Sequence, residues 1–121
     1  MGLDMYALIT KTHPATEVDF KVEDATELHY WRKHPNLHGW MKQLYRDKGG
    51  TDAQFNCAKL LLTEGDLDHL EADLRSGGLP ETCGFFFGES QGDEIEDDLE
   101  FIAKAREAIR GGHAVIYDSW W

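Results

Sequence analysis

Two basic residues stand immediately before the start of a predicted helix. Arg32 and Lys33 precede Pro35, whose fixed φ suits the first turn of a helix. The free backbone N–H groups and the dipole at such a terminus favour an anion. Further along, basic side chains recur at helical spacing and would form one row on the helix surface: His38, Lys42 and Arg46. This pattern predicts a pocket for an anionic, phosphate-bearing ligand.

Two aromatic residues precede the basic pair and extend the candidate site. Tyr30 and Trp31 offer rings for stacking. The predicted ligand-binding residues are therefore Tyr30, Trp31, Arg32, Lys33, His38 and Lys42. The alternative is structural: the basic pair would bind carboxylates elsewhere in the fold, and the basic row would be a solvated helix face.

Histidines and cysteines raise two further hypotheses. His29, His34 and His38 lie close together in the sequence, and Cys57 and Cys83 could add metal ligands. Two histidines four residues apart bind zinc when both lie on one helix face, but Pro35 is expected to keep His34 off the helix. We therefore predict no metal and no cofactor. His38 or His34 could instead act as a general acid or base, with Arg32 and Lys33 holding a charged substrate.

The net charge of −11 is concentrated in one half of the chain. Residues 1–63 hold eight acidic and eight basic side chains, whereas residues 64–121 hold fifteen acidic and four basic ones. This excess disfavours direct binding to nucleic acid or to an anionic membrane. An alternative use of the acidic face is mimicry of nucleic acid in the basic groove of a host protein.

Hydrophobic periodicity predicts the elements that must position the candidate site. Apolar residues at helical spacing predict three helices, over about 35–48, 64–76 and 93–110, with Ile95, Leu99, Ile102 and Ile109 facing inward in the last. Thr63 and Asp66 form a variant of the capping box at the start of the second helix. Strands are predicted over 5–12, 18–22, 55–62 and 114–117, the first two as a hairpin; 28–32 is either a strand or an approach to the first helix, and 84–88 a strand or loop.

These elements predict an α+β fold in a single domain spanning 1–121, with about three helices packed on a four- or five-strand mixed sheet. No apolar run approaches the length that spans a bilayer, and the first residues lack the features of a signal peptide. We therefore expect a cytoplasmic protein with reduced cysteines.

The chain resembles a family of uncharacterised small proteins of phages and bacteria. The shared motifs cover the chain from end to end: residues 1–6 (MGLDMY), 30–33 (YWRK) with His38 and Trp40, 84–88 (GFFFG), 97–99 (DDL) and 119–120 (SW). Members are often labelled phosphoglycerate kinase, but this chain carries none of the nucleotide-site motifs of that much larger two-domain enzyme. The resemblance implies a small phage or prophage accessory protein that binds or inhibits host machinery.

Together these observations predict a non-enzymatic binding protein whose partner is an anionic small molecule or a host protein. Two alternatives stay open: a small acid–base enzyme acting on a charged substrate, and an acidic inhibitor that mimics nucleic acid.

Overall fold

The computed structural model describes residues 3–22, 24–32, 34–77, 79 and 95–120. These residues form four strands and three helices, which makes the fold α+β. The strands are β1 (Asp4–Thr10), β2 (Thr26–Arg32), β3 (Leu60–Leu62) and β4 (Ala114–Trp120), and the helices are α1 (Pro35–Asp47), α2 (Glu64–Ser76) and α3 (Ile95–Arg110). None of these helices has the length and apolar character needed to cross a membrane.

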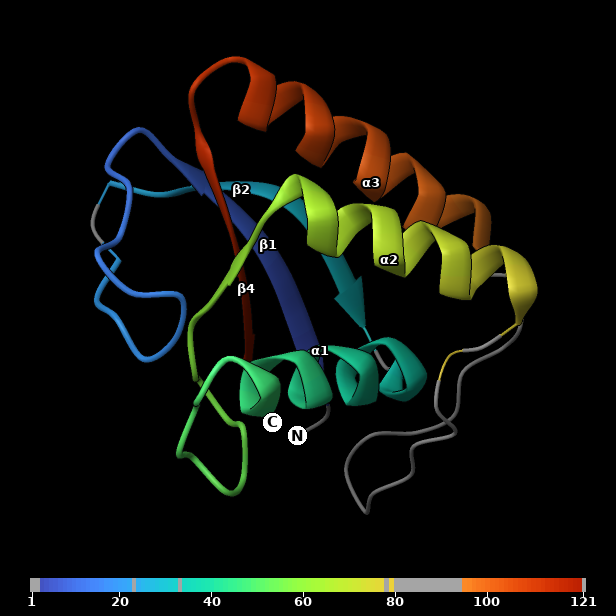
Figure 1. Ribbon diagram of the computed structural model, residues 1–121, viewed down its shortest axis with the longest axis horizontal. Helices are drawn as coiled ribbons and strands as arrows, with labels where there is room; N and C mark the ends of the chain where they lie inside the picture. Colours follow the sequence, from blue (N-terminus) through green and yellow to red (C-terminus); the bar gives the residue numbers. More distant parts are fainter. Residues whose placement is uncertain (1–2, 23, 33, 78, 80–94, 121) are drawn as a thin grey trace.

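The four strands form one sheet in the order β2-β1-β4-β3, and every pairing is antiparallel. The prediction of a mixed sheet was therefore wrong. The described residues between β3 and β4 form two helices rather than one, and Figure 1 shows α2 and α3 running side by side in opposite directions. A single crossover helix would have produced a parallel pair, whereas this helical hairpin returns the chain in the opposite sense.

The two faces of the sheet differ in burial. The inner face carries core residues, among them Met5 and Ala7 of β1, Trp31 of β2 and Tyr117 of β4. The outer face carries the alternating residues, which include Tyr6, Tyr30 and Trp120. Because successive side chains in a strand point to opposite faces, neighbours in sequence separate between core and surface.

Two predicted strands differ from the observed ones. Residues 18–22 do not form a hairpin with β1, because β1 already has β2 on one side and β4 on the other. Only Val18 makes an isolated bridge, to Leu60. The predicted strand over 55–62 is confined to Leu60–Leu62, preceded by Phe55 and Cys57 with φ of 49° and 60°, which extended pairing does not tolerate. The ambiguous segment 28–32 is a strand, whereas residues 80–94, with the predicted 84–88 element and Cys83, lie outside the described residues.

The helices follow the predicted boundaries closely. At the start of α2, Thr63 Oγ1 accepts from the backbone N–H of Asp66 at 3.2 Å, and the Asp66 carboxylate accepts from the backbone N–H of Thr63 at 2.9 Å. This confirms the capping box. α2 ends at Gly77, whose φ of 72° places it in the left-handed region that glycine adopts without strain. In α3 the buried residues are Asp98, Phe101, Ile102 and Ala105, so the inward orientation predicted for Ile95 was wrong; its side chain is exposed.

Candidate functional site

The three predicted ligand-binding residues of β2 are divided between its two faces. Tyr30 and Arg32 point outward and are exposed, whereas Trp31, between them, is buried in the core. His38 of α1 is also buried, and Lys42 of the same helix is half-buried. Strand alternation separates the two sets, so the described structure brings Tyr30 and Arg32 together but not with Trp31 and His38. Lys33 lies outside the described residues.

Inside the fold, Asp98 of α3 joins two of the predicted elements. Its carboxylate accepts a hydrogen bond from Trp31 Nε1 at 2.9 Å and lies 2.8 Å from His34 Nε2. Because a carboxylate only accepts, the imidazole of His34 donates its Nε2 proton to it. Asp98 is 1% exposed, so both interactions are shielded from water. The carboxylate therefore ties β2 and the residue preceding α1 to the first turn of α3.

The neighbouring carboxylate, Asp97, makes a similar contact nearer the surface. Its Oδ2 lies 3.1 Å from Nε2 of His29, and its side chain is 48% exposed. His29 also stacks obliquely on Trp31, with ring centroids 4.5 Å apart, and Phe101 of α3 completes this aromatic group. Residues of α3 thus fix both inward-facing polar rings of β2.

The buried His38 forms a third polar contact. Its Nδ1 lies 2.6 Å from the hydroxyl of Tyr117 on β4, and its ring packs against Phe55. Burial, with a smaller contribution from the charge of Lys42, lowers the pKa of His38 to about 4. Burial raises the pKa of Tyr117 well above its usual value. Both groups are consequently neutral at pH 7, and His38 is not placed to hold an anion by its charge.

The three histidines considered as metal ligands contact different protein groups. His29 pairs with Asp97, His34 with Asp98 and His38 with Tyr117. Within the described ranges no group of three or more histidine, cysteine or acidic side chains has a metal-binding arrangement. The hypothesis of a shared metal centre therefore gains no support there.

The outer face of the sheet gathers exposed and half-buried aromatic and charged side chains in two cross-strand rows. The first row is Arg32, Asp4 and Trp120, which are register partners across β2, β1 and β4. The second runs through Tyr30, Tyr6 and Asp118 in the same order of strands. We call these six residues the outer aromatic grid. Residues next to each other in such rows contact one another directly.

Hydrogen bonds and ion pairs hold the grid in place. The Tyr30 hydroxyl donates to Asp4 Oδ1 at 2.6 Å, and the Tyr6 and Tyr30 ring centroids are 5.3 Å apart. This hydrogen bond raises the pKa of Tyr30, so its phenol stays protonated at neutral pH. Lys59, which precedes β3, pairs with Asp118 at 2.9 Å. Each carboxylate of the grid thus has a hydrogen-bond or ion-pair partner, while Trp120 is 65% exposed and Tyr30 43% exposed.

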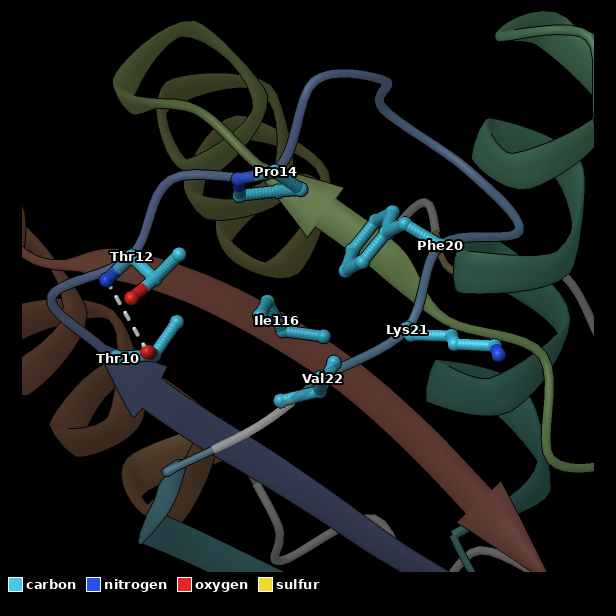
Figure 2. Close-up of a pocket in the computed structure, with 7 residues that line it drawn as sticks. All are labelled: Thr10, Thr12, Pro14, Phe20, Lys21, Val22 and Ile116. Carbon is cyan, nitrogen blue, oxygen red and sulfur yellow. Dashed lines mark hydrogen bonds between the residues drawn. The ribbon is translucent and has the colours of Figure 1, made fainter.

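The remainder of the outer face lies beneath the segment that connects β1 to β2. Figure 2 shows Pro14, Phe20 and Val22 of this segment arranged around Ile116 of β4, with the Lys21 ammonium pointing away. They enclose a cavity of about 120 Å³, which Thr10 and Thr12 also line. The connecting segment therefore covers the end of the outer face near Thr10 and Ile116, away from Tyr30 and Trp120.

The sequence predicted only some of the residues of the outer aromatic grid. It singled out Tyr30 and Arg32 but did not join them to Tyr6, Asp4 or Trp120, because this assembly depends on strands β1 and β4 that are far apart in the chain. The available signal was Trp120, which follows the apolar run of residues 114–117. Comparison of the chain with protein-family models, with curated proteins and with solved structures found no match.

Proposed function

We propose that the protein is a non-enzymatic binding protein that recognises another protein through the outer aromatic grid. The observation that supports this most strongly is the placement of exposed Trp120, Tyr30 and Arg32 on one face of the sheet. Tryptophan, tyrosine and arginine are the residues that contribute most often to binding energy in protein interfaces. Exposed aromatic rings interspersed with charged side chains, arginine among them, are typical of a protein-interaction surface.

The composition of the grid favours a protein over a small anion. Its two carboxylates, Asp4 and Asp118, would repel a phosphate, and each already contacts a neighbouring hydroxyl or cation. Trp31 and His38, which would have completed an anion pocket, are buried elsewhere. The Tyr30 ring is already held by its hydrogen bond to Asp4, which suits a protein partner because little side-chain entropy of this ring is lost on binding. The resemblance to phage and bacterial accessory proteins supports a host protein as that partner.

The acid–base alternative rests on the His34–Asp98 pair. A carboxylate that accepts from an imidazole orients the ring as in many catalytic bases. Here the same carboxylate also binds Trp31, and all three side chains are buried. This arrangement supports a structural anchor better than a catalytic group.

Affinity capture from host cells with two variants and a control tests the proposal. Wild-type protein should capture one partner protein in a fixed molar ratio of partner to bait. Trp120→Ala and Tyr30→Ala remove exposed rings, so both variants should fold normally but fail to capture this partner. Arg75→Ala, on the exposed surface of α2, should retain it. Equal recovery of the same partner by all four proteins would show that binding does not use the grid.

A further inference from the structure

The two edges of the sheet are treated differently by the rest of the chain. At the β3 edge, the backbone of Leu61 donates to Glu17 and Lys59 accepts from Asp19, so the segment 17–19 covers that edge. At the opposite edge, within the described part of the chain, β2 pairs with β1 alone. An edge strand of seven residues offers a row of backbone donors and acceptors to another strand.

β2 also lacks the usual features that block such pairing along most of its length. Residues 26–32 contain neither proline nor lysine, although a bulge at Leu28 interrupts the register with β1. The rest of the strand is held straight from the inside, because His29 and Trp31 are bound to Asp97 and Asp98 of α3. The free edge is therefore presented in a fixed, extended conformation.

The charges of β2 are arranged so that the strand complements itself. Glu27, near the beginning, and Arg32, at the end, are both exposed, and both are register partners of outer-face residues of β1. Glu27 makes no ion pair with another described residue, and the guanidinium of Arg32 is 3.9 Å from Asp4, at the limit of a weak contact. Two copies of β2 running antiparallel would bring each Glu27 close to the Arg32 of the other copy. Cross-strand pairs of opposite charge stabilise such a sheet.

We propose that two copies of the chain associate through antiparallel pairing of their β2 strands, which joins the two sheets into one. A pairing centred on Tyr30 keeps the outer faces on the same side and sets Arg32 opposite the bulge at Leu28, beside Glu27. The two aromatic grids then form one continuous surface. This proposal depends on the free edge and its charges and not on the function proposed for the grid.

Charge reversal tests this pairing with the whole chain. Sedimentation equilibrium should give twice the 13.8 kDa of one chain for the wild type. In a symmetric dimer, position 27 of each copy lies near position 32 of the other, so each single variant creates two pairs of like charge. Glu27→Arg and Arg32→Glu should therefore each raise the dissociation constant of the dimer at least about tenfold. When these two variants are mixed, every facing pair is again opposite in charge, and a dimer containing one of each should form.

Two control variants test whether the effect is specific to the edge of β2. Arg110→Glu makes the same change of net charge as Arg32→Glu but on the exposed surface of α3, and Trp120→Ala alters the outer grid away from the edge; both should dimerise like the wild type. A monomeric wild type, a dimer that is insensitive to both reversals, or a mixture that stays monomeric would each overturn the proposal.

Discussion

At the scale of single residues, Asp98 shows how one buried carboxylate organises this protein. Asp98 occupies a buried position on the inward face of α3, where an apolar side chain is usual. Its two carboxylate oxygens bind Trp31 and His34, which belong to different parts of the chain. A buried acid is tolerated only when such donors compensate for its lost hydration. Its burial was not predicted, because in the sequence it stands among exposed acidic residues that complement the helix dipole.

Replacing Asp98 with alanine should destabilise the protein strongly. The variant leaves the donors of Trp31 and His34 buried without their acceptor, and each unsatisfied buried donor costs about 1–3 kcal/mol. The adjacent Asp97→Ala is the matched control, because Asp97 is half exposed and its pairing with His29 is worth at most about 1 kcal/mol. Urea unfolding measures both free energies. Similar losses for the two variants would contradict the role assigned to Asp98.

His38 predicts a specific dependence of stability on pH. Its pKa is about 4 in the folded protein, below the ordinary value of 6.5, so the unfolded chain binds more protons between these values. The contribution of His38 is complete above pH 6.5 and is lost as the pH falls towards 4, by up to about 3 kcal/mol. In His38→Asn this component should be absent. Parallel stability curves for the two proteins from pH 7 to pH 4 would disprove the assignment.

At the scale of elements, local signals were reliable where a few neighbouring residues determine the structure. Pro35 marks the beginning of α1, Thr63 and Asp66 cap α2, and Gly77 ends it. Each depends on backbone geometry or on hydrogen bonds within one turn. Such signals are contained in the sequence and need no tertiary contact.

Elements whose pairing is long-range were predicted less well. The alternation in residues 18–22 is typical of a strand, but β1 is occupied on both sides and the segment instead lies over Ile116. The candidate site shows the same limit. Tyr30 and Arg32 could be recognised within β2, whereas Asp4, Tyr6, Asp118 and Trp120 join them only through the strand order. Sequence periodicity indicates which face a residue occupies and not which strand lies beside it.

The capping box of α2 gives a quantitative prediction at this scale. Thr63→Ala removes the acceptor for the Asp66 backbone N–H and should cost about 1 kcal/mol. For a domain of this size the melting midpoint should fall by about 4 °C. Thr51→Ala is the control, since this exposed threonine caps no helix. If both variants melt at the same temperature, the cap contributes nothing measurable.

At the scale of the whole molecule, charge and aromatic surface are segregated. The four basic residues of α2 and α3 each pair with acids of the same two helices: Arg75, Lys104, Arg106 and Arg110. Acidic side chains outnumber basic ones on these two helices, which predicts weak binding of polyanions to this surface. The outer aromatic grid lies on the opposite face of the sheet, where the charges are balanced. The acidic surface of α2 and α3 and the outer aromatic grid are therefore expected to differ in the molecules they bind.

The affinity of the captured partner for the outer grid is the most direct test of the central claim. Titration calorimetry with the purified partner should show binding to the wild type and a dissociation constant at least about tenfold higher for Trp120→Ala, because a central tryptophan typically contributes more than 1 kcal/mol. Thermal unfolding of the variant should be unchanged, since the removed ring is mostly exposed. An unaltered dissociation constant in a normally folded Trp120→Ala protein would contradict the proposed role of the outer face.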